Sequence, residues 1–185
     1  CVKHKVHKDR LILDRRPRNA LEKRFRWARL PHGTQLCQLI LPRHKTVRGS
    51  LDDLSNYFYS LSQAPGATEL NPGGRRFQGH TLNRHLGLSL SPLKYYRACM
   101  RVQGMGDHNG PDVAQVTHEA VLRKHGCLSP ENQLFFDQVV PESDTWEGVY
   151  IDDKLVLHVL DHHLLNSRAP SLPDVQLVEK GTHAY

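Results

Sequence analysis

The sequence has no run of apolar residues long enough to span a lipid bilayer, which predicts that no helix crosses a membrane. Its 4 cysteines lie far apart and form no Cys-x-x-Cys pair, so neither a zinc ribbon nor a redox motif is expected. So few cysteines favour free intracellular thiols over a disulfide framework. An initiator methionine and an apolar signal core are also absent. We therefore expect an intracellular chain cut from a longer open reading frame or trimmed from a longer product.

Charge is distributed unevenly along the 185 residues. Residues 1–50 carry 14 Lys and Arg against 3 Asp and Glu, a net charge of +11, whereas residues 51–185 carry 11 against 16, a net charge of −5. A basic first third joined to an acidic remainder suits a protein that grips a polyanion at one end and holds metal ions at the other. A solvated basic surface explains the composition equally well.

Local patterns predict a single domain of mixed strands and helices. Residues 64–92 are rich in proline and glycine and are expected to form loops. Trp27 and Trp146 are expected to be packing anchors. The predicted strands are residues 11–13, 36–41, 46–51, 146–151 and 154–160, and the predicted helices are residues 19–29, 54–61 and 111–126.

Two adjacent acids, Asp152 and Asp153, separate the last two predicted strands by only two residues, which is hairpin spacing. Asp-Asp is poor turn chemistry, because the like charges repel and hairpin turns favour Asn-Gly or Asp-Gly. Carboxylates on a rigid hairpin suit a divalent metal ion, which prefers hard oxygen ligands. Taken alone, the pair fits an acidic surface turn better than a metal site.

Two other segments become informative when they are considered together with the hairpin. Asp53 follows the predicted strand 46–51, and Phe58 comes five residues later. The segment 104–111 carries three glycines and ends in Pro111, a residue suited to the first position of a helix. Each has a plain structural alternative: Asp53 caps a helix, Phe58 belongs to the core, and 104–111 is an ordinary turn before a helix.

In chain order, these segments resemble the motifs of reverse transcriptases, especially those encoded by retroelements. Tyr150-Ile151-Asp152-Asp153 matches the Tyr-x-Asp-Asp signature, and Asp53 with Phe58 matches the first palm motif. Residues 105–111 look like the motif that usually reads Gln-Gly, three residues, Ser-Pro and opens the palm helix, although Met105 and Gly110 replace its Gln and Ser.

Residues 10–19 are similar to the fingers motif of the same family, and Lys3 stands where its lysine would stand. The resemblance covers roughly residues 1–160. It implies an α+β right-hand polymerase palm, an antiparallel sheet backed by helices, with partial fingers and no thumb. The implied domains are residues 1–50 as basic fingers, 51–165 as the palm with the metal-binding acids, and 166–185 as a tail.

The implied activity is RNA-directed DNA polymerisation with two Mg²⁺ ions, or Mn²⁺ as a substitute, on an RNA template, a DNA primer and deoxynucleoside triphosphates. The resemblance assigns metal binding to Asp53, Asp152 and Asp153. It assigns triphosphate contacts to Lys3 and Arg10, the template to Arg16, the sugar to Phe58, the nascent base pair to Gly106 and the primer end to Tyr150. One alternative function is that of a catalytically inactive, nucleic-acid-binding remnant of a retroelement polyprotein. Another is that of a small metal-dependent nuclease or other phosphotransferase, which shares the acids but needs neither the fingers motif nor Phe58.

Overall fold

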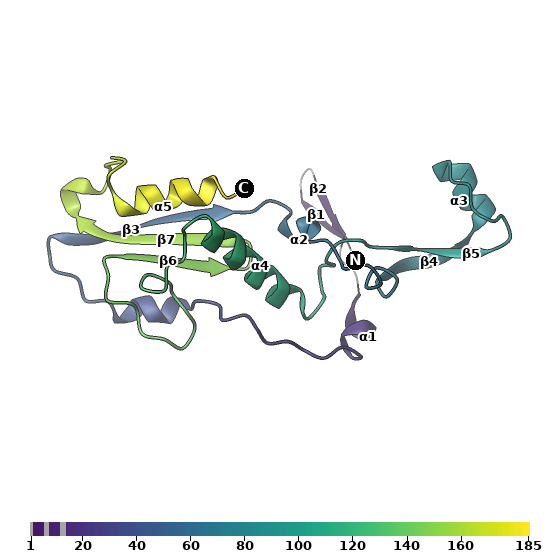
Figure 1. Cartoon of the computed structure of the whole chain (residues 1–185), viewed down its shortest axis with the longest axis horizontal. Helices are drawn as coiled ribbons and strands as arrows, with labels where there is room; N and C mark the ends of the chain where they lie inside the picture. The colour runs from purple at the N-terminus through teal and green to yellow at the C-terminus, as the bar shows by residue number, and fades with distance from the viewer. Residues whose placement is uncertain (1, 6–7, 12–13) are drawn as a thin grey trace. The chain divides into compact units, whose positions relative to one another are not determined.

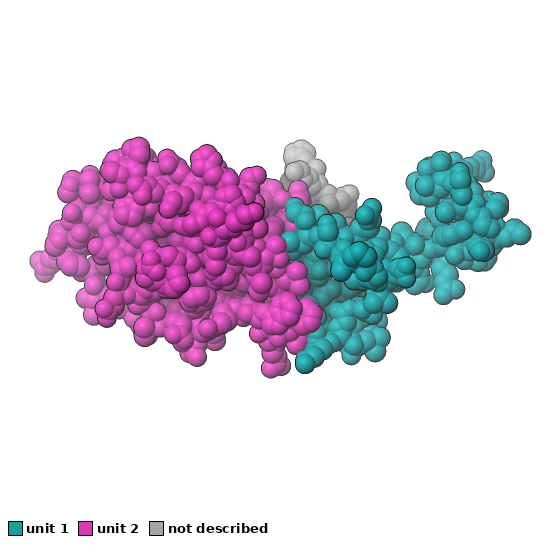
Figure 2. Space-filling view, viewed as in Figure 1, with its two compact units in different colours: residues 1–23, 58–110 teal, residues 24–57, 111–185 magenta. Residues whose placement is uncertain are grey.

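The fold is described by a computed structural model, which covers the backbone of residues 2–5 and 8–11 and all of residues 14–185 (Figure 1). The chain divides into two compact units, each discontinuous in sequence (Figure 2). Unit 1 comprises residues 1–23 and 58–110, and unit 2 comprises residues 24–57 and 111–185.

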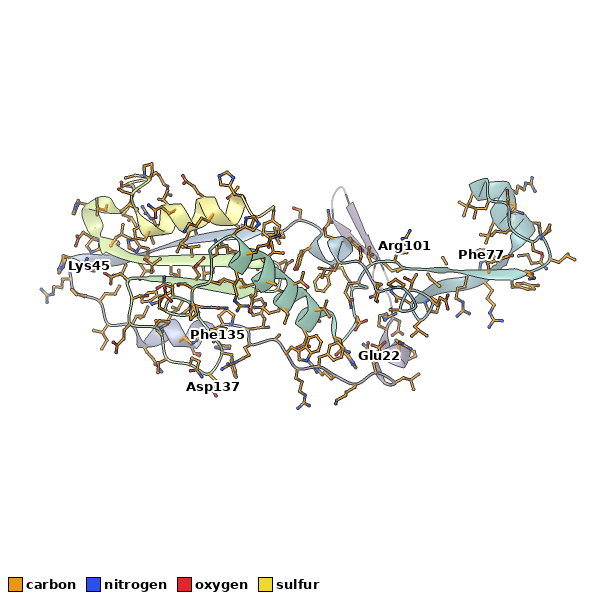
Figure 3. All side chains as sticks on the ribbon, viewed as in Figure 1. Glu22, Lys45, Phe77, Arg101, Phe135 and Asp137 are labelled. Carbon is orange, nitrogen blue, oxygen red and sulfur yellow. The ribbon has the colours of Figure 1, made fainter. Side chains whose placement is uncertain are left out.

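Unit 2 is built on a three-stranded antiparallel sheet in the order β3–β7–β6. Strand β3 is Lys45–Asp53, β6 is Thr145–Tyr150 and β7 is Asp153–Asp161. The central strand β7 reads as a nearly continuous Leu and Val run, and its residues from Val156 to Leu160 are buried. Lys45, at the start of β3 (Figure 3), forms an ion pair of 3.6 Å with Asp161 at the end of β7.

Residues that pair across these strands point to the same face of the sheet, and successive residues alternate between faces. One face, here called the acid face, carries Val47, Gly49, Leu51 and Asp53 of β3, Asp153, Leu155, Leu157 and Val159 of β7, and Trp146, Gly148 and Tyr150 of β6. The other, here called the helix face, carries Arg48, Ser50, Asp52, Lys154, Val156, His158, Thr145, Glu147 and Val149.

Two helices cover the helix face. Helix α4, Gly110–Lys124, contributes Leu122 to a buried cluster with Cys127, Leu128 and Val149. Helix α5, Pro173–Thr182, is attached by a buried ion pair in which both guanidinium Nε and Nη2 of Arg48 donate to Asp174, at 2.7 and 2.8 Å. The short 3₁₀ helix η2, His162–Leu164, connects β7 to this segment.

The acid face is covered at one end only. There Trp146, Leu157 and Val159 pack with Leu134 and with apolar residues that follow or belong to the 3₁₀ helix η1, Gly33–Gln38. The indole Nε1 of Trp146 donates to the carbonyl of Pro141 at 2.9 Å, so this tryptophan is a packing anchor. At the hairpin end of the same face, Leu51 and Tyr150 are exposed. The sheet therefore presents an open surface beside the acidic turn.

Unit 1 contains two antiparallel strand pairs. Strands β1, Val2–Lys5, and β2, Lys8–Leu11, form one pair, and β4, Pro72–Gln78, and β5, Tyr95–Cys99, form the other. Helix α3, Gly79–Leu86, follows β4, while α1, Arg16–Asn19, and α2, Tyr57–Ser60, are single turns.

The observed fold is of the mixed α+β class with antiparallel sheets, as predicted. Strand 46–51, helix 111–126 and the hairpin of 146–151 with 154–160 are confirmed by β3, α4 and β6–β7. The longest helix in the described part of the chain has 15 residues, and none there has the length and apolar character needed to cross a bilayer.

Other local predictions are wrong. Residues 36–41 are not a strand, because His32 and Gln35 form a capping box that starts η1. Residues 21–29 are not helical, since α1 ends at Asn19. The segment 64–92 contains β4 and α3, which depend on pairing with the distant β5. In the predicted strand 11–13, Leu11 ends β2, and residues 12–13 lie outside the described residues.

The boundaries of the two units differ from the domain boundaries expected from the sequence. The boundary after residue 50 falls inside β3. Residues 166–185, expected as a separate tail, contain α5 and belong to the same unit as the β6–β7 hairpin.

Candidate active site

The acidic hairpin turn has a strained backbone. Tyr150 pairs with Asp153, which leaves Ile151 and Asp152 as the two turn residues, one position earlier than the Asp152-Asp153 turn expected from the sequence. Ile151 adopts a left-handed φ of 61°. This region is unfavourable for any L-residue and most unusual for a β-branched one. Strain of this kind persists only where the surroundings enforce it, and it is concentrated at functional sites.

Side chains of α4 hold the turn in this conformation. The Oε1 atom of Gln115 accepts the N–H of Ile151 at 2.7 Å, and its Nε2 donates to the carbonyl of Val149 at 2.8 Å. His118 Nδ1–H donates to the carbonyl of Ile151 at 2.8 Å. Gln115 and His118 are each only 1% exposed. Three hydrogen bonds from one helix therefore fix the backbone on both sides of the strained residue.

Asp53 lies directly opposite Asp153 in the register of β3 and β7. The N–H of Leu54 donates to the carbonyl of Asp152 at 3.1 Å, which ties the end of β3 to the turn. Burial raises the pKa of the Asp153 carboxyl, and the negative charges of Asp152 and Asp53 raise it further. Asp53 and Asp152 thus lie near enough to Asp153 for their negative charges to disfavour its ionised form, and a bound cation would relieve this repulsion.

The neighbouring acid, Asp52, lies on the helix face, opposite Lys154. Lys154 is buried, with its ammonium donating to the carbonyl of Leu177 at 2.6 Å and lying 3.5 Å from the Glu147 carboxylate and 3.4 Å from Cys127 Sγ. The register therefore separates the two adjacent acids: Asp53 shares a face with Asp153, and Asp52 does not.

Behind the turn, Asp52, Leu54, His118, Lys154, Gly181, Thr182 and Tyr185 line a cavity of about 220 Å³. Burial lowers the pKa of His118, although its bond to the Ile151 carbonyl opposes the change. His118 Nε2 is buried and has no hydrogen-bond partner among the described residues. Burial also raises the pKa of Tyr185 to about 12. Both side chains are therefore neutral near pH 7, and the cavity adds no positive charge from them to the acids.

The donor set suits a hard divalent cation. In the part of the chain that the structure describes, no three His, Cys, Asp or Glu side chains converge closely enough to form a metal site unaided. Magnesium sites in phosphoryl-transfer proteins commonly use only one or two carboxylates and take further ligands from substrate phosphates and water. The oxygens of Asp53, Asp152 and Asp153 fit that pattern of incomplete protein coordination.

The other predicted residues belong to unit 1, apart from Tyr150, which is 51% exposed on the acid face. Lys3 and Arg10 are paired partners in the register of β1 and β2. Arg16 is exposed and forms a two-point ion pair with Asp14, at 2.9 and 2.7 Å, and its hydrogen bonds lower the pKa of Asp14 to about 2.

Within unit 1, the segment 14–19 contacts the loop that contains Gly106. Asn19 Nδ2 donates to the carbonyl of Gly106 at 2.9 Å, and its Oδ1 accepts the N–H of His108 at 3.2 Å. Gly106 has a left-handed φ of 100°, which favours glycine. Buried Arg15 forms an ion pair of 2.9 Å with Asp107 and also binds Asn71. The segment 14–19 therefore holds the loop of Gly106 in place.

Phe58, in α2, lies beside Gly110. A Cβ atom at residue 110 would approach the Phe58 ring to 3.3 Å and the Gln103 amide to 3.4 Å. Glycine at this position, where the resembled motif usually has serine, gives the ring room. Phe58 is half-buried.

Sequence reasoning missed Gln115, His118 and Arg15. Val116 and Ala120 of α4 are exposed, and its buried side carries the polar Gln115 and His118 as well as Leu122. One signal was available: these two polar residues are three apart, so they share a helix face, and they lie within the segment that follows the Gly106 motif. Arg15 gave no signal of its own beside the exposed Arg16.

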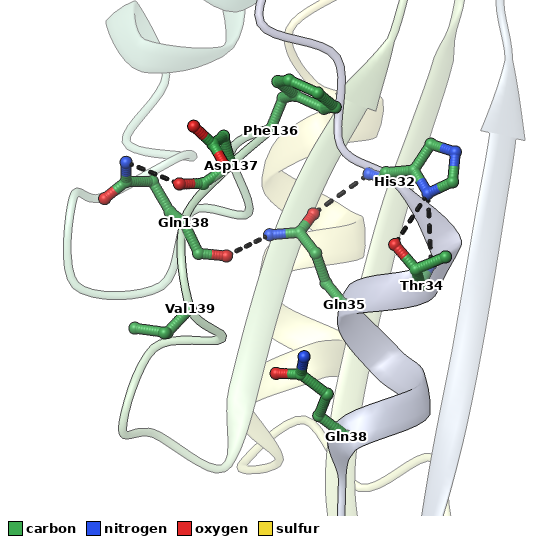
Figure 4. A pocket seen from close by; sticks show the side chains of 8 residues that line it. All are labelled: His32, Thr34, Gln35, Gln38, Phe136, Asp137, Gln138 and Val139. Carbon is green, nitrogen blue, oxygen red and sulfur yellow. Dashed lines mark hydrogen bonds between the residues drawn. The ribbon is translucent and has the colours of Figure 1, made fainter.

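A larger hollow, of about 470 Å³, lies elsewhere in unit 2, between η1 and the loop of residues 136–139 (Figure 4). Gln35 reaches across it, and its Nε2 donates to the carbonyls of Phe135 and Gln138 at 2.7 and 2.8 Å. His32 Nδ1 lies 2.9 Å from the Thr34 hydroxyl. These polar groups connect the walls to one another, and the carboxylates of the hairpin are not among the lining residues.

No protein-family model matches the chain, and no curated protein matches it.

Proposed function

We propose that the chain is the palm, with part of the fingers, of a template-directed polymerase of the reverse-transcriptase type, an RNA-directed DNA polymerase. One observation carries the proposal: Asp53 and Asp153 pair across β3 and β7 beside the constrained turn that holds Asp152. A sheet with open acids on one face and helices on the other provides a rigid base for metal-dependent phosphoryl transfer.

The proposed reaction joins the primer 3′-hydroxyl oxygen to the α-phosphorus of a deoxynucleoside triphosphate and releases pyrophosphate. Two Mg²⁺ ions, or Mn²⁺ in their place, would supply charge neutralisation at the attacking and leaving oxygens when bound. Asp53 and Asp152 are the proposed principal ligands, and Asp153 is the third acid. The α4 hydrogen bonds keep Asp152 on a turn that cannot relax, so little reorganisation is needed during the reaction.

The residues of unit 1 would handle the substrates. We assign the incoming triphosphate to Lys3 and Arg10, the RNA template to Arg16, the deoxyribose to Phe58 and the new base pair to Gly106. Arginine suits phosphate because its planar fork donates two hydrogen bonds at once. Arg16 is exposed, and its side-chain partner among the described residues is the neighbouring Asp14, which a phosphate can replace.

Primer extension on an RNA template with Mg²⁺ tests the proposal. The chain is compared with its Asp152→Asn/Asp153→Asn variant, and circular dichroism establishes that both are folded. Extension by the parent and its loss in the variant is the expected result. Equal extension by both would refute the assignment of the acids.

A folded parent that binds RNA–DNA hybrid and extends nothing, with Mg²⁺ or Mn²⁺, would favour the inactive, nucleic-acid-binding remnant. Binding of that kind depends steeply on salt, because phosphate contacts release counterions.

A further inference from the structure

An aromatic stack lies exposed in unit 2, within the extended segment that precedes η1. The rings of Phe25 and Trp27 lie parallel, with centroids 4.1 Å apart and planes within 6°. Trp27 is 54% exposed and Phe25 41%, whereas the other tryptophan, Trp146, is 3% exposed. The expectation that Trp27 is a packing anchor is therefore wrong. The two rings stack on each other, and each keeps a large exposed fraction.

The backbone between the rings accounts for the stack. Arg26 adopts a left-handed φ of 58°. In an extended chain, residues two apart are too widely spaced for direct ring stacking, and a left-handed residue between them shortens the distance that separates them. This conformation is unfavourable for a residue other than glycine. The stacked arrangement is thus maintained against a local conformational cost.

Positive charge surrounds the stack. Arg24, Arg26 and Arg29 alternate with the rings, and residues 23–31 contain no acid. The three arginines are exposed. Among the described residues, Arg24 and Arg26 form no ion pair with a carboxylate. We name residues 24–29 the aromatic–arginine strip.

The strip is attached to the folded body at its C-terminal end. The N–H of Ala28 donates to Asp112 Oδ1 at 2.7 Å, and Asp112 is buried in the first turn of α4. The guanidinium of Arg29 lies 5.5 Å from the centroid of the Phe135 ring and donates to the carbonyl of Phe136 at 3.4 Å; Phe135 is labelled in Figure 3. The stack is therefore presented by a fixed support.

We propose that the aromatic–arginine strip binds single-stranded nucleic acid, with an unpaired base stacking on the Phe25–Trp27 pair and phosphates paired with Arg24 and Arg26. Flat rings accept any base, and guanidinium groups accept the adjoining phosphates. A duplex offers no free base faces except at its ends, so the strip distinguishes single strands from duplexes. The inference deepens the proposed function and rests on it in one respect: the single strand would be the template.

Trp27 reports directly on stacking. In a Trp146→Phe variant it is the only tryptophan, and a stacked base quenches its fluorescence. The probe is a twelve-nucleotide oligouridylate, titrated in EDTA without nucleotides, beside a blunt duplex of the same length. Quenching by the single strand at low salt, with much weaker quenching by the duplex, is the expected result. Binding that leaves Trp27 fluorescence unchanged would overturn the proposal.

Substitutions then separate rings from charges. Phe25→Leu/Trp27→Leu should weaken oligouridylate binding, measured by anisotropy of a labelled strand, by about five- to a hundredfold per stacked base. Arg24→Gln/Arg26→Gln should lower the slope of log K against log salt by about 1.4, because two phosphate contacts are lost. The matched control is Tyr95→Leu, which removes an exposed aromatic of β5 and should leave affinity unchanged.

The remaining outcomes distinguish failure of the strip proposal from failure of the polymerase proposal. If the Phe25→Leu/Trp27→Leu variant binds like the parent, or if the strip instead mediates concentration-dependent self-association that this variant abolishes, the nucleic-acid proposal is overturned. Primer extension is measured on the same proteins. Quenching without extension counts against the polymerase alone, and extension without quenching counts against the strip alone.

Discussion

Replacing Gln115 with methionine should destabilise unit 2 and loosen the acidic turn. Methionine keeps the length and volume of the side chain but removes the acceptor for the Ile151 N–H and the donor to the Val149 carbonyl. It also removes the donor to the Glu119 carboxylate. Each buried backbone group left without a partner costs about 1–3 kcal/mol, so the loss of both partners should lower the free energy of unfolding by roughly 2–6 kcal/mol. That is a large share of the about 5–15 kcal/mol of a typical domain.

Urea unfolding followed by far-ultraviolet circular dichroism measures this change. Gln176→Met, the same substitution at an exposed position of α5 with a single bond to Pro170, is the control and should cost no more than about 0.5 kcal/mol. Amide hydrogen exchange adds a local reading, since the N–H of Ile151 should lose protection first. An effect of Gln115→Met no larger than that of the control would refute the view that α4 holds the turn.

Three further changes test neighbouring features. Ile151→Gly removes a left-handed strain of about 1–2 kcal/mol and should leave the free energy of unfolding within about 1 kcal/mol of the parent; a loss above about 2 kcal/mol argues against strain. Burial raises the pKa of Asp174, but the hydrogen bonds and charge of Arg48 outweigh it and lower that pKa. The pair therefore stabilises the fold above about pH 4 and loses this effect as pH falls through the lowered pKa. Asp174→Asn should cost about 3–5 kcal/mol at pH 7 and should reduce the loss of stability on acidification below about pH 4, and an unchanged pH dependence there contradicts the assignment. Mg²⁺ should raise the melting temperature of the parent and of Asp52→Asn but not of Asp53→Asn. The opposite result for the two variants would make Asp52 the metal ligand in place of Asp53.

Local sequence patterns were sufficient for the elements that carry the acids. The hairpin of β6 and β7 was predicted from two β-rich runs separated by Asp152-Asp153, because strand preference and turn spacing act over a few residues. The existence of α4 followed from Pro111 at its start and Gly126 just beyond its end. Its polar contacts with the turn did not follow, since a local pattern does not show which polar side chains a helix buries.

Helix α5 and the strands β4 and β5 were not predicted for a related reason. The segment of α5 has little apolar content, and the helix is stabilised by the Arg48–Asp174 pair, whose partners are 126 residues apart. Strands β4 and β5 exist because they pair with each other across the intervening α3. Pairing between distant segments leaves no mark in the local pattern of either one.

The sequence by itself determined which residues are chemically able to act: the three acids, their order along the chain, and their places at the end of a strand and in a hairpin turn. The tertiary structure decided which of them meet, because the register of β3 on β7 places Asp53 with Asp153 and turns Asp52 to the opposite face. It also decided that Trp27 is exposed while Trp146 is buried. Both residues are tryptophans, and only the surroundings that the fold supplies distinguish a packing anchor from an exposed ring.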